Sequence, residues 1–162
     1  MLFRSVEVMT MTSVTLDTIG VPQEIQSSKK YNFVREKLMS MDRKTQSVEM
    51  QKLGAAPEWA IGSVHAITED GHAMIASNTG SQLPAYAYAS PHVIWVVGAQ
   101  KIVTNVDEGM KRIYDYVLPL ESERAHKAYG VPASAVNKLL VVHKEVIPNR
   151  ITVILVKEVL GF

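Results

Sequence analysis

Residues 62–103 read GSVHAITEDGHAMIASNTGSQLPAYAYASPHVIWVVGAQKIV, and this stretch decides the fold. Apolar residues alternate on either side of Asp70-Gly71, which predicts two antiparallel strands joined by a two-residue turn. A polar loop, residues 78–82, follows the second strand directly. The nearly continuous apolar run from His92 to Gly98 predicts a strand covered on both faces, at the centre of a sheet. A polar loop at a strand end is where ligands of open α/β sheets collect.

The composition indicates one domain, residues 1–162, long enough to bury about 70% of its unfolded surface. Lysine and arginine total 17 against 16 for aspartate and glutamate. Neither sign forms a block, so we expect no nucleic-acid or membrane partner. The absence of cysteine excludes disulfides and any iron–sulfur cluster ligated by this chain alone. Without a signal-peptide pattern or an apolar run of membrane-spanning length, a cytoplasmic protein is expected.

The segments before the hairpin alternate between strand and helix patterns. Residues 6–12 alternate as a short strand, and Ser13 then begins a short helix. Between residues 28 and 53, apolar side chains recur every three or four positions, which predicts an amphipathic helix that breaks near Asp42.

Helices are also predicted after the polar loop. A short helix is predicted at residues 83–89, and residues 107–117 have helical periodicity. A second helical piece, residues 120–129, is expected to follow a break at Pro119, because proline lacks the backbone donor that a helix interior needs.

Two β-branched runs, residues 138–142 and 151–156, predict the last strands. A turn around Pro148-Asn149 separates them, so they could form a terminal hairpin. Taken together, the patterns predict an α/β domain with an open mixed sheet flanked by helices.

Five segments of the chain are distinctive: GSVHAITEDG, SNTGSQLPAYAY, VIWVVGAQKIV, VLPLESERA and the ending RITVILVKEVLGF. They resemble the LUD-domain family of lactate-utilisation proteins, and the resemblance covers nearly all the chain from Thr12 onward. That family is assigned to the fold shared by ribose-5-phosphate isomerases, glucosamine-6-phosphate deaminases and CoA-transferases, so the resemblance implies this fold. Members generally carry another helix and strand before the segment matching TSVTLDTIG, and the chain therefore looks shortened at its N-terminus.

The polar loop is the first candidate binding element. Glycine lets the backbone approach a ligand, and free amides at a helix start suit a phosphate or carboxylate. The alternative is a plain strand-to-helix turn in which a loop hydroxyl caps the helix. The loop residues proposed to bind are Asn78, Thr79, Gly80, Ser81 and Gln82.

Lys101 follows the central strand, so its ammonium is expected to emerge where the loops gather and to attract an anion. A solvated surface lysine is the alternative. Thr12 and Ser13, at the end of the first strand, could supply further hydrogen-bond donors across the same crevice, although helix capping explains them equally well.

The two-residue turn predicts a register that pairs Glu69 with His72 and His65 with Ala76. His65 then lies about 13 Å from Glu69, at about 3.3 Å per residue, too far for one metal ion to bind both. The remaining histidines are scattered along the chain, and no metal site is expected.

Glu69 carries a separate hypothesis, because TEDG is similar to the Ser-Glu-Asn-Gly turn of CoA-transferases, in which the glutamate forms a thioester. Only Glu69 and Gly71 match that turn. A carboxylate in a closed cleft can act as a nucleophile if donors stabilise the developing oxyanion. A solvated turn carboxylate is the alternative.

Two functions follow from the resemblance. The first is a non-redox component of lactate or other hydroxy-acid utilisation that binds a small anionic metabolite, with any iron–sulfur cluster on partner subunits and no cofactor on this chain. The second is a CoA-dependent acyl transferase or a sugar-phosphate isomerase-like enzyme that uses Glu69. Tyrosines such as Tyr114 could line a pocket or form a subunit contact in a homo-oligomer, and packing between helices is the alternative.

Overall fold

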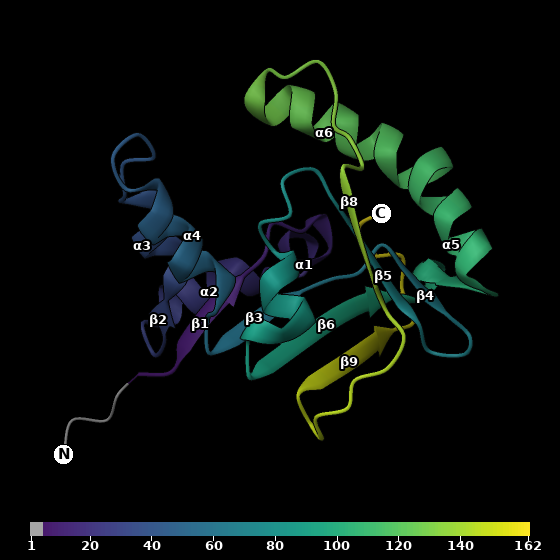
Figure 1. Ribbon diagram of the computed structural model, residues 1–162, viewed down its shortest axis with the longest axis horizontal. Coiled ribbons are helices and arrows are strands. Elements are labelled where there is room, and N and C mark those ends of the chain that lie inside the picture. The colour runs from purple at the N-terminus through teal and green to yellow at the C-terminus, as the bar shows by residue number, and fades with distance from the viewer. Residues whose placement is uncertain (1–4) are drawn as a thin grey trace.

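The computed structural model describes residues 5–162, which form two sheets and a set of helices (Figure 1). The larger sheet has the strand order β2-β1-β3-β6-β9, and every pair in it is parallel. The smaller sheet has the order β7-β4-β5-β8 and contains both parallel and antiparallel pairs. The strands are β1 (Glu7–Thr10), β2 (Asn32–Phe33), β3 (Trp59–Gly62), β4 (Ala66–Thr68), β5 (Ala73–Ser77), β6 (His92–Gly98), β7 (Ile102–Val103), β8 (Lys138–Val142) and β9 (Ile151–Val156).

Helices flank both sheets, which confirms the predicted α/β class. In Figure 1, α2, α3 and α4 gather beside β1 and β2, whereas α5 and α6 form a long arc near the smaller sheet. The helical segments are α1 (Val14–Thr18), α2 (Val21–Ser28), α3 (Val34–Met39), α4 (Ser47–Ala55), η1 (Ala85–Ala89), η2 (Ala99–Lys101), α5 (Val106–Arg112), η3 (Ile113–Val117) and α6 (Leu118–Tyr129). No helix in residues 5–162 combines the length and the apolar character needed to cross a membrane.

Strand β6 lies between β3 and β9, as its apolar sequence predicts. Val93, Trp95 and Val97 share one face of β6 and pack in a buried cluster with Ile75 of β5. The main core therefore lies between the two sheets. The ring of Trp95 meets the ring of Tyr86 edge-on, with 5.5 Å between the ring centres.

Strand β5 is buried along its whole length because both of its faces are covered. Ala73 and Ile75 face the larger sheet, whereas Met74 and Ala76 pack in a second cluster with Ile113. The alternation of side chains along a strand divides these residues between the two layers. A helix layer, a small sheet and a large sheet therefore stack in that order.

The hairpin is present, but its predicted register is wrong by one residue. Ile67 lies opposite Ala73, so the turn contains three residues and only Gly71, with φ +95°, adopts a left-handed conformation. A three-residue loop that ends in a left-handed glycine is a common hairpin connection. Thr68 therefore stands opposite His72, to whose carbonyl oxygen its N–H donates, while the N–H of Glu69 donates to Val103.

The amphipathic helix predicted between residues 28 and 53 is correct only in part: the break near Asp42 is present, between α3 and α4, but residues 29–33 are not helical. Helix α2 ends at Ser28, the chain reverses at Lys29 (φ +52°), and the short strand β2 follows before α3 and α4 begin. The cause is tertiary: residues 32–33 add a strand parallel to β1, and the pairing outweighs local helical spacing.

The predicted helix break at Pro119 does not occur, because α5, η3 and α6 are continuous. The π-helical turn η3 inserts one residue before α6, so Pro119 falls at the start of α6. Proline is tolerated at that position because its missing N–H has no partner to lose.

A terminal hairpin of the last two strands is also ruled out. Strand β8 pairs antiparallel with β5 in the smaller sheet, and β9 pairs parallel with β6 in the larger sheet. The turn at Asn149, where φ is +60°, is present as predicted, but it redirects the chain from one sheet to the other.

Candidate functional site

A cavity of about 1180 Å³ lies at the carboxyl ends of the parallel strands β1, β3 and β6. Residues 11–15 after β1, residues 63–65 after β3 and Lys101 after β6 all line it. Loops at this edge of a parallel sheet are free of strand pairing and can present polar groups to a ligand. The cavity is therefore in the place that the strand-end argument predicts.

Eight of the nine site residues predicted from the sequence line this cavity. The structure brings together groups that come from three separate parts of the chain, and it leaves only Glu69 outside. The eight are Thr12, Ser13, Asn78, Thr79, Gly80, Ser81, Gln82 and Lys101.

Lys101 is buried, with 1% of its surface exposed, although a solvated lysine would extend into water. Its Nζ donates to Thr15 Oγ1 at 2.9 Å, to Ser63 Oγ at 3.1 Å and to the carbonyl oxygen of Val64 at 3.2 Å. All three acceptors are uncharged, and among residues 5–162 Lys101 forms no ion pair. Burial, and then the charge of Arg112, lowers the pKa of Lys101 to about 8.

His65 and Arg112 lie close to Lys101 and extend the basic cluster. Arg112 Nε donates to the carbonyl oxygen of His65 at 3.0 Å, and the N–H of Ala76 donates to His65 Nδ1 at 3.1 Å. Burial lowers the pKa of His65 to about 4, and the charges of Lys101 and Arg112 add to this effect. The imidazole is therefore neutral at pH 7, with its proton on Nε2 because Nδ1 accepts a hydrogen bond.

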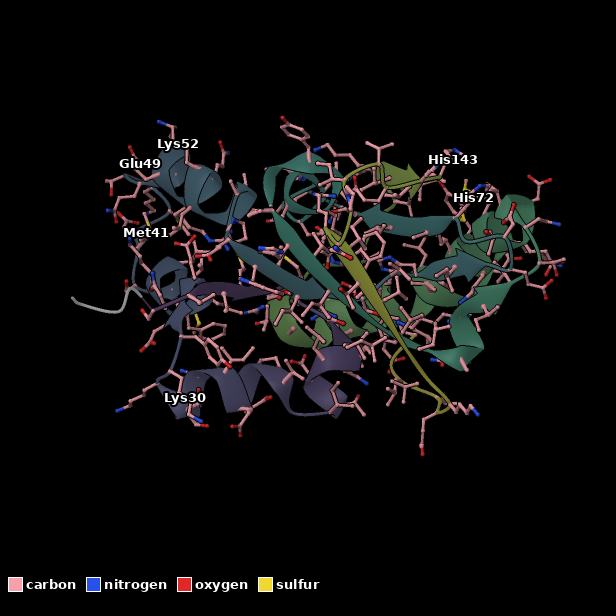
Figure 2. All side chains as sticks on the ribbon, turned by 90° about the horizontal axis from the view of Figure 1, so that it is seen from below. Lys30, Met41, Glu49, Lys52, His72 and His143 are labelled. Carbon is pink, nitrogen blue, oxygen red and sulfur yellow. The ribbon has the colours of Figure 1, made fainter. Side chains whose placement is uncertain are left out.

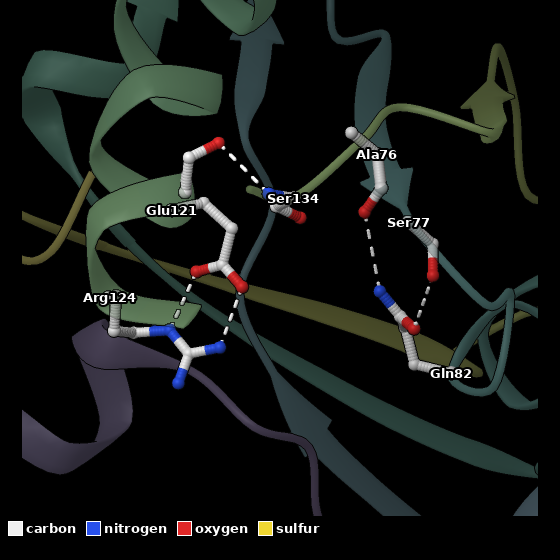
Figure 3. Close-up of polar contacts among 7 residues, drawn as sticks. Ala76, Ser77, Gln82, Glu121, Arg124 and Ser134 are labelled. Carbon is white, nitrogen blue, oxygen red and sulfur yellow. Dashed lines mark hydrogen bonds and ion pairs between the residues drawn. The ribbon is translucent and has the colours of Figure 1, made fainter. Parts of the chain in front are cut away.

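The loop 78–82 is closed by its own hydrogen bonds (Figure 3). Gln82 accepts from Ser77 Oγ at 2.9 Å and donates to the carbonyl oxygen of Ala76 at 3.3 Å. The N–H of Gly80, where φ is +86°, donates to Ser77 Oγ at 2.8 Å. These contacts hold the loop in one shape beside the cavity.

The loop amides were expected to be free for a ligand, and two of them are not. The N–H groups of Gly80 and Ser81 donate to Ser77 Oγ and Thr79 Oγ1, respectively. Directly after the loop, the N–H of Leu83 donates to the carbonyl oxygen of Gly80. The helical segment η1 begins only at Ala85. Asn78, Thr79 and Ser81 are exposed, so their side chains are accessible polar groups of the loop.

Contacts from the C-terminal part of the chain support the loop, and no local pattern in the sequence indicates them. Asn137 Nδ2 donates to Asn78 Oδ1 at 2.7 Å, and Lys138 Nζ donates to the carbonyl oxygen of Thr79 at 2.6 Å. Both residues stand at the start of β8, which the topology brings beside β5.

Near the N-terminal end of the described chain, helix α1 contributes Thr15 to the cavity wall. Ser13 acts as the N-cap of α1, accepting from the N–H of Leu16 at 3.4 Å, so the capping interpretation of Ser13 is correct. Thr15 Oγ1 donates to the carbonyl oxygen of Leu160 at 3.1 Å and accepts from Lys101. Sequence reasoning considered Ser13 and missed Ser63, whose only signal is its position directly after β3.

The wall formed by α6 contributes an ion pair. Arg124 donates to Glu121 through two nitrogens, at 2.7 Å and 2.6 Å, and the N–H of Ser134 donates to Ser122 Oγ at 3.1 Å (Figure 3). Basic side chains outnumber acidic ones around the cavity, which favours an anionic ligand. The basic residues are Arg35, Arg43, Lys101 and Arg124, and the acidic ones are Asp17 and Glu121.

Glu69 is exposed at the hairpin turn and does not line the cavity. Beside it, His72 stacks edge-on against His143, with 4.5 Å between ring centres. Figure 2 shows both histidines at one end of the molecule and Met41, which lines the cavity, at the other. Within residues 5–162, no group of three potential metal ligands comes together. Glu69 therefore stands outside the cavity that the other predicted site residues line.

Comparison with known proteins gives one match. The model of a protein family described as LUD domain matches residues 3–156, which is nearly the whole chain. No curated protein matches the sequence at a significant level.

Proposed function

Because this chain belongs to the LUD-domain family, which is associated with lactate-utilisation proteins, we propose that it binds a small anionic metabolite in the cavity beside Lys101. The ligand we propose is a hydroxy acid such as lactate, or the corresponding oxo acid. The protein would then be a non-redox component of lactate utilisation.

One observation carries this proposal: Lys101 is a buried cation without a carboxylate partner in the described part of the chain. A buried ammonium is costly unless a charge of opposite sign lies nearby. Arg150, which is also buried, has such a partner in Glu145. An anionic ligand in the cavity would give Lys101 a negatively charged partner, as Glu145 does for Arg150.

The remaining polar groups fit the same ligand. The hydroxyls of Thr12, Thr79 and Ser81 can donate to a carboxylate, and the side-chain amides of Asn78 and Gln82 line the same space. These neutral donors would orient the ligand, whereas the basic residues would provide the attraction.

Redox chemistry would belong to other proteins. The chain has no cysteine to hold an iron–sulfur cluster, so electrons from a hydroxy acid would pass to a cluster on a partner subunit. Isolation of the tagged protein from its native cells should then recover a cysteine-rich iron–sulfur protein with it, and a Lys111→Glu surface variant serves as a control for non-specific capture.

A thermal-shift comparison tests the binding proposal. Lactate, pyruvate, CoA and a sugar phosphate are each added to the wild type and to Lys101→Met, because a ligand that binds only the folded state raises the melting temperature. We expect lactate or pyruvate to raise the melting temperature of the wild type and not that of Lys101→Met. A rise of equal size in both proteins, or none in the wild type with any of the four, would reject the site.

A further inference from the structure

We propose that Lys101 is a nucleophile that forms an imine with the carbonyl carbon of a 2-oxo acid held in the cavity. This inference rests on the proposed function, since the acid group must be bound before the carbonyl reaches the amine. It adds a covalent step that anion binding does not require.

The surroundings of Lys101 Nζ favour the neutral amine. Its three partners, Thr15, Ser63 and Val64, are uncharged, and the guanidinium of Arg112 is close enough to repel a positive charge. Lysine becomes a useful nucleophile when it is desolvated or placed beside another cation. Both conditions hold here, because Lys101 is 1% exposed and has Arg112 as a neighbour.

The hydrogen bonds also determine where the lone pair of the neutral amine lies. Thr15 Oγ1 already donates its hydrogen to the carbonyl oxygen of Leu160, so it can only accept from Lys101. The carbonyl oxygen of Val64 likewise can only accept. The two N–H bonds of a neutral amine therefore point at Thr15 and Val64.

The third position, toward Ser63 Oγ, is left for the lone pair. A hydroxyl can reverse its role, and the hydroxyl of Ser63 can donate either to the amine or to the carbonyl oxygen of Val64, which it reaches at 3.3 Å. Ser63 is half-buried and lines the cavity. The lone pair thus points toward Ser63, which lines the cavity that would hold the ligand.

The step is balanced without an oxidant or a metal. The amine nitrogen forms a bond to the carbonyl carbon, the π electron pair moves to the oxygen, and a proton passes from nitrogen to oxygen to give a carbinolamine. Loss of that oxygen as water then leaves the C=N bond. Ser63, which contacts Nζ, is placed to relay the proton between nitrogen and oxygen.

The cavity favours a 2-oxo acid over a simple ketone or aldehyde. Its basic lining attracts a carboxylate, and the hydroxyls of Thr79 and Ser81 can bind it while the adjacent carbonyl faces Lys101. A 2-oxo acid carries both groups, the carboxylate and the carbonyl, on neighbouring carbons.

Reductive trapping tests the proposal. The wild-type protein is treated with pyruvate and sodium borohydride, digested and examined by mass spectrometry for a lysine that has gained the mass of pyruvate less one oxygen atom. We expect the adduct on the peptide that contains Lys101, with at least about tenfold more there than on exposed lysines such as Lys111. A uniform distribution over surface lysines, or no adduct, would overturn the imine.

Two variants separate the imine from anion binding. Lys101→Arg keeps the charge and removes the nucleophile, so it should abolish trapping while pyruvate still raises its melting temperature; Lys111→Arg should trap as the wild type does. Because peptide mapping on the wild type needs no variant, a misfolded Lys101→Arg protein would leave the test intact. A pyruvate-induced melting shift without an adduct rejects the imine alone. An adduct on Lys101 that forms equally well with acetone rejects the anion site alone.

Discussion

The hydroxyl oxygen of Tyr86 lies 1.6 Å from the point at which the Cβ of a side chain at Gly62 would stand. Tyr86 is fully buried against Trp95, and Gly62 is the last residue of β3 before Ser63. The close approach of the Tyr86 ring to the backbone of Gly62 therefore fixes the position of the chain just before Ser63, which lines the cavity.

Gly62→Ala should destabilise the protein by about 3 kcal/mol, because the rigid ring cannot move without disturbing the core. Urea denaturation measures the loss. Gly109→Ala is the matched control: its Cβ would meet the flexible Met74 at 2.2 Å, and the better helix propensity of alanine offsets part of the clash. Adding Tyr86→Phe to Gly62→Ala should recover part of the stability, since it removes the nearest atom. Equal losses at both glycines would contradict this account.

Stability should fall as the pH drops from about 6.5 to 4. The pKa of His65 is lowered to about 4 in the folded protein, so between these values the unfolded chain binds more protons than the folded one. Melting temperatures at pH 7, 6 and 5 test this. His65→Asn, whose side-chain oxygen can still accept from the N–H of Ala76, should flatten the decline, whereas substitution of the exposed His126 should leave it unchanged. An identical acid profile in wild type and His65→Asn would refute the assignment.

Lys101 should make stability depend on pH in the alkaline range. Its folded pKa of about 8 lies below the ordinary value of 10.5, so stability should rise with pH between these values as the buried ammonium is discharged. Lys101→Met should lose this rise.

The two roles of Lys101 have opposite pH dependence. The melting shift produced by lactate should shrink from pH 7 to pH 9, because the charge that attracts the anion disappears. Trapping by pyruvate should increase over the same range, because the neutral amine is the nucleophile. If both signals change in the same direction, Lys101 does not serve as both the cation and the nucleophile.

Arg150 should be far more important for stability than Arg124. Arg150 is 3% exposed, and its guanidinium pairs with Glu145. The guanidinium also donates to the carbonyl oxygens of Ser90, Ala85 and Tyr86, at 2.9, 3.0 and 2.9 Å. Arg150→Lys leaves at least one of these carbonyl oxygens unpartnered and should cost about 2–4 kcal/mol in chemical denaturation. Arg124→Lys alters a partly exposed pair and should cost about 1 kcal/mol or less. Comparable losses would show that the buried contacts add little.

Much of the fold is encoded in local pattern. The runs at residues 92–98, 138–142 and 151–156 form strands with the predicted bounds, because β-branched apolar residues in short blocks favour buried strands. Loop 78–82 and Lys101 meet at one cavity because each follows a strand of the sheets, and the strand-end rule uses only the order of elements.

Pairing partners could not be predicted in the same way. Strands β8 and β9 are neighbours in sequence, yet β8 pairs with β5 in the smaller sheet and β9 with β6 in the larger one. The pairing partner of an apolar strand depends on which side chains it buries in the core, and local sequence does not specify this. The contact of Lys101 with Thr15 joins residues 86 positions apart, and no spacing rule reaches that far. The one-residue error in the hairpin comes from the prediction of a two-residue turn, whereas the turn has three residues and only its last, Gly71, is left-handed.

The π-helical turn η3 affects the direction in which the side chains of α6 point. An α-helix advances by about 100° per residue, so the additional residue in η3 rotates everything after it by roughly that angle. Deleting one residue between Ile113 and Val117 would restore ordinary α-helical winding, and Glu121 and Arg124 would then swing off the wall they now form. A single additional residue in η3 thus determines which side chains of α6 face the cavity.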